Sequence, residues 1–346
     1  MSNTLSQNII KWYDYHGRKD LPWQGSNAYH VWISEIMLQQ TQVIKVIDYF
    51  NNFINTFPTL KSLAEAESEQ VLACWSGLGY YNRARNLHKT AQICSEKHEG
   101  QLPIDLNQLM QLPGIGRTTA GAILSLASDL PYPILDGNVK RVMSRFYKIS
   151  DEKISLYNAK LWKQVDKLMP KSHCRKYNQA LMDLGSMICT RSKPHCHRCP
   201  IMKNCKARIS DQVALFPQSN KKTKQINKTY HILLLVSEGQ IYIEKRNSQS
   251  IWPQLWFLPM FDTEQKLHSS NLFELEPFTH YLNFNIKHIL THRKLDLQVH
   301  CYKNTTTIDR KITKNNKWTA ISQYKKLPHP TALVKIIQYY LANEDT

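Results

Sequence analysis

The spacing of apolar residues changes once along this chain, and that change restricts the fold more than any single motif does. Up to about residue 208, apolar residues recur every three or four positions between caps and breakers, as in helices. Residues 209–228 are polar and rich in Lys and lose this repeat, which is typical of a linker. The run YHILLLV, a turn at 237–240 and the run IYIEKR then predict a β-hairpin. We therefore expect a helical domain over 1–208 and a smaller α+β domain over 229–346.

Within this frame the sequence also predicts individual elements. The helical repeat is clearest in the segments 28–42, 60–75, 82–98, 105–111, 117–128, 137–147, 155–169 and 175–188. Residues 286–302 alternate as strands do, and residues 331–342 predict a closing helix. No stretch approaches 18 uninterrupted apolar residues, and the first residues contain no apolar signal region. We expect a soluble cytosolic protein without a membrane span.

Four cysteines lie within 17 residues at the end of the helical part, in the order Cys189, Cys196, Cys199 and Cys205. Because nothing indicates secretion, this array predicts a metal group rather than disulfides. A [4Fe–4S] cluster and a structural zinc site both accept four Cys ligands. We favour one [4Fe–4S] cluster in loop 189–205, because common zinc sites contain two CxxC pairs and this array contains one. The scattered cysteines are expected in the core: Cys74, Cys94, Cys174 and Cys301.

The positive charge is concentrated in the first two thirds of the chain. Of a net charge of +18, the first 228 residues contribute most, with 31 Lys and Arg against 17 Asp and Glu. Such an excess suits a polyanion such as nucleic acid, although a merely Lys-rich composition would give the same count.

Residues 112–116, Leu-Pro-Gly-Ile-Gly, lie between two predicted helices. Pro113 ends the first helix, while Gly114 and Gly116 permit a tight turn whose backbone N–H groups face outward at the start of the next helix. Such a turn can bind a DNA phosphate without reading sequence, although the same residues also form plain turns. The pattern is similar to the hairpin of a helix-hairpin-helix element over about 105–128.

Two carboxylates are candidates for chemistry. Asp136 precedes the segment 137–147, where it is either an ordinary N-cap or an ionised group that faces a developing positive charge. Glu35 is the one carboxylate of the segment 28–42, which is apolar on nearly every side. If that helix is buried, the pKa of Glu35 rises and the residue can act as a general acid. If the helix is amphipathic, Glu35 is a partly exposed surface residue.

Taken together, these motifs resemble the endonuclease III superfamily of DNA glycosylases, and within it the adenine DNA glycosylase (MutY) family. The matching stretches are dense over residues 8–208: LPW at 21–23, SEIMLQQTQV at 34–43, GLGYY at 77–81, LDGNVKRV at 135–142 and MDLG at 182–185. The resemblance implies a multidomain fold, in which an all-α helix-hairpin-helix glycosylase domain with a [4Fe–4S] loop precedes a C-terminal α+β Nudix-like domain. It further implies a monomeric, cytoplasmic, nucleoid-associated bacterial protein that acts on double-stranded DNA with A:8-oxoguanine or A:G mispairs.

The resemblance also implies residue roles. Adenine is flipped out of the duplex and protonated by Glu35, and Asp136, helped by Asn138, stabilises the cationic sugar electrostatically or by transient covalent attachment. Gln40 and Tyr80 fill the vacated stack and wedge the neighbouring bases. Further positions that match residues of the adenine pocket or the DNA interface are Leu21, Trp23, Gly114, Gly116, Thr118, Lys140 and Gln179. Basic residues among the cysteines are expected to face the phosphate backbone: Arg191, Lys193, His195, His197, Arg198 and Lys203.

Thr118 bears on the type of reaction. Bifunctional members of the superfamily carry a nucleophilic Lys two residues past the last glycine of the hairpin, where this chain has Thr118. A threonine cannot form the Schiff base that strand cleavage by β-elimination requires. The resemblance therefore predicts a monofunctional glycosylase that hydrolyses the N-glycosidic bond and leaves the strand intact.

The C-terminal domain resembles the Nudix-like domain that inspects the opposite 8-oxoguanine in this family. The box G-x5-E-x7-R-E-x2-E-E of working Nudix hydrolases is missing after Leu258. The Phe-Ser-His recognition loop of the family aligns with Leu290-Thr291-His292, so Thr291 and His292 are expected to contact the lesion, while Leu290 lacks the aromatic ring.

Three rival functions remain to be weighed. Thr118 disfavours a thymine-glycol or mismatch glycosylase with lyase activity, and the missing box disfavours a nucleotide-pool hydrolase. A non-catalytic iron–sulfur DNA-binding protein would need neither Glu35 nor Asp136. The sequence therefore favours an adenine DNA glycosylase of base excision repair.

Overall fold

The computed structural model describes residues 2–151, 153–218, 225–270, 278–304 and 313–344. They form two compact units, each described here by itself. The first comprises Met1–Glu65 and Arg85–Lys221, and the second comprises Ala66–Ala84 and Lys222–Thr346. No helix in the described ranges has both the length and the apolarity needed to cross a membrane.

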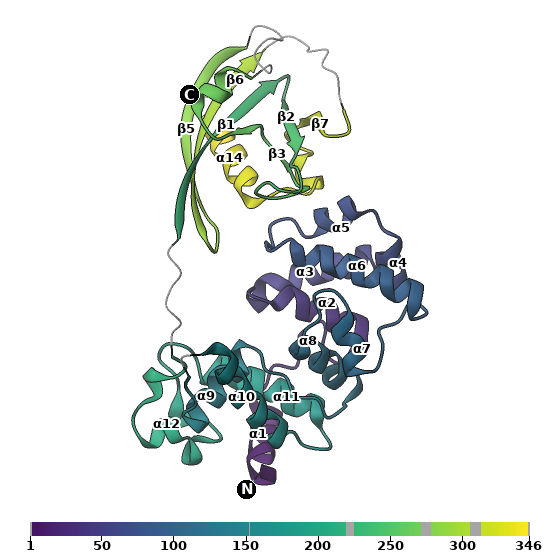
Figure 1. Cartoon of the computed structure of the whole chain (residues 1–346), viewed down its shortest axis with the longest axis vertical. Coiled ribbons are helices and arrows are strands. Elements are labelled where there is room, and N and C mark those ends of the chain that lie inside the picture. Colours follow the sequence, from purple (N-terminus) through teal and green to yellow (C-terminus); the bar gives the residue numbers. More distant parts are fainter. Residues whose placement is uncertain (1, 152, 219–224, 271–277, 305–312, 345–346) are drawn as a thin grey trace. The chain divides into compact units, whose positions relative to one another are not determined.

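The first unit is built of helices (Figure 1). In chain order these are α1 Ser2–His16, α2 Ala28–Leu38, α3 Val43–Thr56, α4 Leu60–Glu65, α6 Asn82–Lys97, α7 Leu106–Gln111, α8 Arg117–Ala122, η1 Ile123–Ala127, α9 Gly137–Tyr147, α10 Ile154–Leu168, α11 Cys174–Asp183, η2 Leu184–Ile188, η3 Cys196–Arg198, η4 Met202–Asn204, α12 Lys206–Ile209 and η5 Val213–Leu215. Helices α1, α9, α10 and α11 bury a common apolar core. Helices α8 and α11 run directly into the π-helical turns η1 and η2, and such turns are frequent at functional sites.

Several predicted segments differ from the observed helices. In the predicted segment 28–42 the helix ends at Leu38. Gln39 follows it with a non-helical ψ of 112°, and Gln40 adopts the left-handed conformation with φ 59°. The segment 60–75 is interrupted at Glu67, whose extended backbone starts the new helix α5, Ser68–Cys74. Helices α1 and α3 were not among the predicted segments. Of the four scattered cysteines, three are buried, whereas Cys74 is partly exposed.

The second unit is a mixed sheet with helices. Its strands are β1 Ile226–Ser237, β2 Gln240–Lys245, β3 Trp256–Phe257, β4 Met260–Phe261, β5 Thr279–Ile289, β6 Arg293–Asn304 and β7 Asn316–Ala320. The strand order is β3-β2-β1-β6-β5, with β4 pairing with β1 and β7 with β2. Strands β1 and β6 are parallel along their full length, while the other pairs are antiparallel. The helices of this unit are α5, α13 Glu264–His268, η6 Tyr324–Lys326 and α14 Thr331–Ala342.

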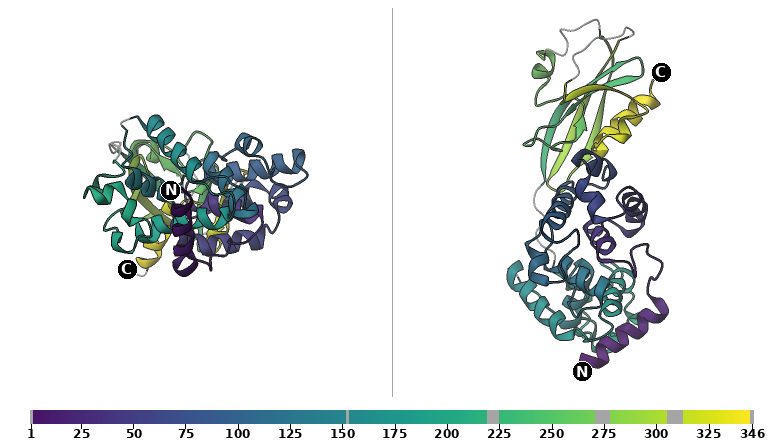
Figure 2. Two further views of the ribbon diagram at one scale, coloured as in Figure 1. Left: turned by 90° about the horizontal axis from the view of Figure 1, so that it is seen from below. Right: turned by 90° about the vertical axis from the view of Figure 1, so that its right-hand side faces the viewer.

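Two local predictions for this unit are confirmed. Strands β1 and β2 form the predicted hairpin, and its two turn residues, Glu238 and Gly239, have φ angles of 47° and 72°, as a type I′ turn requires. The closing helix α14 covers residues 331–342 and lies beside the sheet (Figure 2, yellow helix). It packs on β5, where the rings of Phe284 and Tyr339 stack at 4.4 Å. Strand β1 begins at Ile226, so the described part of the predicted linker ends before residue 228.

Residues 66–84 belong to the second unit although they precede most of the first unit in sequence. Glu69 of α5 accepts hydrogen bonds from the Trp256 indole and from Lys245 Nζ, at 2.5 and 3.0 Å. Tyr81 Oη donates to the His329 carbonyl at 2.6 Å, and the His329 N–H donates to Ser76 Oγ. These polar contacts attach the loop after α5 to the sheet domain.

Candidate active site

A cavity of about 480 Å³ lies in the first unit between α2, α8, α9 and α11. It brings together most of the predicted site residues of this unit: Leu21, Trp23, Glu35, Gln40, Thr118, Asp136, Asn138 and Gln179. Gly114, Gly116 and Lys140 do not line it. Residues from five stretches that are far apart in sequence therefore meet in one space, which is large enough for a nucleobase.

Glu35 lines this cavity from helix α2. The helix begins at Asn27, whose side chain accepts a hydrogen bond from the His30 N–H, and most of its residues are buried. Burial, and secondarily the charge of Asp136, raise the pKa of Glu35 to about 8. No described residue is hydrogen-bonded to its carboxyl group. Glu35 is therefore protonated at neutral pH and free to donate its proton to a ligand.

Asp136 is the N-cap of helix α9. Its Oδ1 accepts a hydrogen bond from the Val139 N–H at 2.7 Å, and its Oδ2 accepts one from Asn138 Nδ2 at 2.9 Å. Burial raises the pKa of Asp136, while these donors and Arg141 oppose the rise. The N-terminal position lowers the pKa through these backbone donors, but burial outweighs it, contrary to the expectation that the helix dipole would keep Asp136 ionised. The two hydrogen bonds fix the orientation of the carboxyl group.

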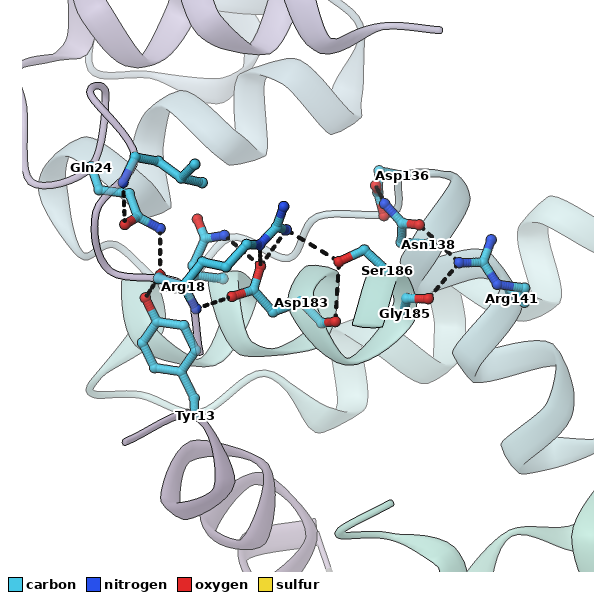
Figure 3. A network of polar contacts seen from close by, with 11 residues as sticks. Tyr13, Arg18, Gln24, Asp136, Asn138, Arg141, Asp183, Gly185 and Ser186 are labelled. Carbon is cyan, nitrogen blue, oxygen red and sulfur yellow. Dashed lines mark hydrogen bonds and ion pairs between the residues drawn. The ribbon is translucent and has the colours of Figure 1, made fainter. Parts of the chain in front are cut away.

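A hydrogen-bonded chain holds Asn138 in place (Figure 3). Arg141 donates to Asn138 Oδ1 at 2.8 Å and to the Gly185 carbonyl at 2.6 Å. Its Nε also donates to the Cys189 carbonyl at 2.7 Å. A Cβ atom on Gly185 would lie 2.6 Å from Asn138 Cβ, so only glycine permits this approach of η2 to α9.

An ion pair lies behind the cavity (Figure 3). Asp183 is fully buried and accepts hydrogen bonds from the Arg18 N–H at 2.8 Å, from Arg18 Nε at 3.0 Å and from Gln179 Nε2 at 3.1 Å. The Arg18 carbonyl in turn accepts from Tyr13 Oη and Gln24 Nε2. This network ties the loop before α2, which carries Leu21 and Trp23, to helix α11.

The predicted hairpin forms between α7 and α8. The Ile115 N–H donates to the Leu112 carbonyl at 3.2 Å, and Gly114 has φ 79°, so the turn is of type II with Pro113 at its second position. Gly116 starts α8 without a side-chain cap. The first N–H groups of α8 therefore lack the side-chain acceptor that Asp136 supplies to α9.

The four cysteines of the array line one small cavity, which Arg145 also lines. Arg145 is buried and has no acidic partner among the described residues, and its Nη1 donates to Cys189 Sγ at 3.3 Å and to the Thr190 carbonyl at 2.7 Å. No three His, Cys, Asp or Glu side chains in the described ranges are grouped so that they could hold a single metal ion. The basic residues that we expected to face DNA from this loop are exposed: Arg191, Lys193, His195, His197, Arg198 and Lys203.

In the second unit, Thr291 and His292 occupy the exposed turn between β5 and β6. The Leu290 N–H donates to the Arg293 carbonyl at 2.8 Å, which closes the turn around them. Tyr80 has φ 52° and its Oη lies 3.0 Å from Thr291 Oγ1. Two predicted DNA-binding residues thus meet at the tip of this hairpin.

Families of known proteins match both parts of the chain. The family described as HhH-GPD superfamily base excision DNA repair protein matches residues 33–167, and a NUDIX domain matches residues 231–339. Among solved structures, a thermostable thymine-DNA glycosylase is similar with a TM-score of 0.55 and 24% identity, over 60% of this chain and 97% of that one. A non-covalent endonuclease III–DNA complex is similar with a TM-score of 0.52 and 22% identity, over 61% and 98%. These structures agree with the helical fold.

Curated relatives are closer in sequence. The adenine DNA glycosylase of Buchnera aphidicola subsp. Acyrthosiphon pisum is 43% identical over 299 residues, which are 82% of this chain and 85% of that protein. The adenine DNA glycosylase of Buchnera aphidicola subsp. Baizongia pistaciae is 40% identical over 342 residues, which are 96% and 95%. The chain belongs to the adenine DNA glycosylase family. The enzyme is a hydrolase of N-glycosyl bonds that acts on DNA in base excision repair.

Three residues of this glycosylase were not predicted as site residues, namely Arg18, Arg141 and Asp183. Arg141 follows Asn138 by one helical turn, and this spacing is a signal that places both side chains on one face of α9. Asp183 is the one carboxylate of an otherwise apolar stretch, as Glu35 is in α2. Nothing in the local sequence identifies Arg18, because its partner is 165 residues away.

Proposed function

We propose that this glycosylase removes adenine opposite 8-oxoguanine or guanine by acid-assisted hydrolysis, with Glu35 as the general acid. The observation that carries the proposal is a carboxyl group with a pKa of about 8 in the same cavity as a second carboxyl group that is held by hydrogen bonds. Adenine is a poor leaving group until a ring nitrogen accepts a proton. A neutral Glu35 supplies that proton at physiological pH.

Asp136 has the complementary role in this proposal. When the N-glycosidic bond breaks, positive charge develops on the sugar, and a carboxylate fixed beforehand stabilises it without reorganisation. The bonds from Val139 N–H and Asn138 Nδ2 supply this fixed orientation, and Arg141 orients Asn138. Burial raises the pKa of both carboxyl groups, but hydrogen-bond donors oppose the rise at Asp136 alone, and this difference in environment suits two roles.

We further propose that the enzyme is monofunctional. Thr118 lines the cavity where a Schiff-base lysine would be required, and its Oγ1 donates to the Leu135 carbonyl at 3.3 Å. A hydroxyl group in this position cannot form an imine with the abasic sugar. The product is therefore an intact strand with an abasic site.

Cys189, Cys196, Cys199 and Cys205 would hold one [4Fe–4S] cluster. The arrangement fits such a group, because the four side chains line one cavity and the buried Arg145 offers a positive charge beside Cys189. The cluster would fix the fold of the loop 189–205 and leave the chemistry to the two carboxyl groups. The exposed basic residues of this loop would contact phosphates.

The remaining predicted residues would bind the duplex. Gly114 and Gly116 present the start of α8 to a phosphate, and Lys140 adds charge on α9. Gln40 and Tyr80 both hold left-handed backbone conformations, and such strain is common where side chains must project into a ligand. Leu21, Trp23 and Gln179 would surround the flipped adenine. Thr291 and His292 would contact the opposite 8-oxoguanine from their exposed turn.

One assay tests the proposal. A duplex with a single A:8-oxoguanine pair is incubated under single-turnover conditions and analysed with and without hot alkali, beside the Glu35→Gln variant. Breakage of the adenine strand after alkali alone, lost in the variant, supports the proposal. Breakage without alkali would indicate lyase activity, and the absence of any breakage would leave a binding protein.

A further inference from the structure

A second cavity lies in the first unit and shares two side chains with the catalytic cavity. It measures about 490 Å³. Trp23 and Gln179 line both cavities, and no other residue in the described ranges does. The exposed residues Lys19, Asp129 and His173 line the second cavity but not the first, so it opens to solvent at a different place.

The two shared side chains carry unused hydrogen-bonding atoms. Trp23 and Gln179 are 4% and 8% exposed. Gln179 Nε2 donates to Asp183 Oδ1, but Gln179 Oε1 and the Trp23 indole N–H have no hydrogen-bond partner in the part of the chain that the structure describes. Neither atom is among the fully buried unpaired atoms of the described residues, so water reaches both of them, and a ligand in the cavity could replace that water. An indole donor and an amide acceptor match adenine, whose edge carries the N7 acceptor and the N6 amino donor.

The charges around the second cavity favour a neutral ligand. Lys176 Nζ pairs with Asp14 Oδ1 at 2.8 Å, and Lys19 Nζ donates to the Asp14 carbonyl at 2.6 Å. Arg175 Nη2 donates to the Ala127 carbonyl at 2.6 Å. Of these three cations, Lys176 is neutralised by a carboxylate, and the exposed Asp129, which also lines the cavity, opposes the binding of a phosphate.

We propose that the second cavity receives the free adenine base and releases it to solvent while the abasic strand still occupies the catalytic cavity. This inference rests on the proposed function, because it needs an excised base. The base enters with the DNA, and after cleavage the DNA blocks that entrance. Movement of the Trp23 and Gln179 side chains, rather than of the backbone, would connect the two cavities. Release of the base then need not await release of the DNA.

Equilibrium dialysis with radiolabelled adenine tests the inference. The enzyme is saturated with a duplex that carries a tetrahydrofuran analogue of the abasic site, so that DNA fills the catalytic entrance. We expect one adenine to bind per enzyme–DNA complex. In Lys176→Trp, an indole on the cavity wall should weaken this binding by at least about tenfold, which corresponds to about 1.4 kcal/mol. The matched control is Lys163→Trp on the exposed face of α10, which should bind adenine as the unmodified enzyme does.

Two results would overturn the inference: exclusion of adenine from the enzyme–DNA complex, or equal binding by Lys176→Trp and Lys163→Trp. A thermal melt of both variants confirms that each is folded. The proposed function is tested separately, by alkali-dependent strand breakage in a single turnover. If strand breakage is observed, we compare the rate of adenine release with the rate of breakage in each variant. The ratio of the two rates should be lower in Lys176→Trp than in Lys163→Trp. Equal ratios would also contradict the inference while leaving the proposed function intact.

Discussion

Replacement of Glu35 by Gln is expected to stabilise the fold while it abolishes excision. The pKa of Glu35 is about 8 in the folded protein, against 4.5 for an unperturbed glutamate. Between these values the folded state holds a proton that the unfolded state has released, so this group makes folding less favourable as pH rises. At pH 7 the penalty is about 3 kcal/mol, because one pKa unit corresponds to about 1.4 kcal/mol. A buried amide costs about 1 kcal/mol, which leaves a net gain of about 2 kcal/mol for Glu35→Gln.

Denaturant unfolding of the unmodified enzyme and Glu35→Gln at several pH values measures this effect. The difference in the free energy of unfolding should be absent near pH 5, should grow as pH rises to 8 and should then level off, since both states are ionised above that pH. The control is Glu65→Gln, because Glu65 is largely exposed and pairs weakly with Lys61 at 3.8 Å. A difference that does not vary with pH, or a variant that is less stable at pH 7, would refute the assignment of a protonated Glu35.

The same pKa predicts the pH dependence of the reaction. The acid must be protonated to act, so ionisation of Glu35 should not limit the single-turnover rate below pH 7, whereas at acid pH the protonation of Asp136, whose pKa burial raises, should lower that rate. Above the pKa of about 8 it should fall by about tenfold for each further pH unit. A rate that rises through this range would mean that Glu35 acts as a base.

Three further predictions follow from single positions. Gly185→Ala should lower the free energy of unfolding by about 2 kcal/mol and slow excision, because the added Cβ would lie 2.6 Å from Asn138 Cβ. The control is Gly137→Ala, whose added Cβ meets open space, so denaturant unfolding should show no change in its stability. Thr118→Lys should introduce strand breakage without alkali, and trapping with borohydride should yield a covalent enzyme–DNA complex only in that variant. Cys199→Ser should abolish broad absorption at roughly 400 nm and lower the melting temperature, and an unchanged spectrum would contradict the proposed cluster.

The sequence was most informative where structure is decided by neighbouring residues. The hairpin at Glu238 and Gly239 was predictable because a short polar turn that contains glycine lies between two strand-like runs, and glycine permits the left-handed backbone that such a turn needs. Helix α14 was predictable because its apolar repeat is bounded by Pro330 and by polar residues. Its buried face packs on the sheet, so the local pattern and the tertiary contact agree.

The sequence was misleading where tertiary contacts override the local pattern. The predicted helical segment extends through Gln42, yet the helix ends at Leu38, its last apolar residue, and Gln40 adopts the left-handed conformation. Glutamine has no local reason to adopt this conformation, which costs about 1 kcal/mol or more. The surrounding fold must supply that energy, and no pattern within 28–42 could indicate it. The residue that departs from the helix is also the one that is proposed to enter the DNA stack.

The same distinction separates the candidate site residues that the sequence singled out from those that only the structure brought to attention. Glu35 and Asp136 could be singled out because an isolated carboxyl group in an apolar helix or at a helix start has a chemical meaning by itself. Asp183 is equally isolated in sequence, but its carboxylate forms an ion pair with Arg18, which lies 165 residues away in the chain. Asp183 holds the loop that carries Leu21 and Trp23 against α11. This role depends on a tertiary contact, so the sequence around Asp183 does not reveal it. A lone carboxyl group in an apolar stretch of sequence therefore identifies a position of interest. Whether it can serve as a general acid or forms a structural ion pair depends on whether the fold places a cationic partner beside it.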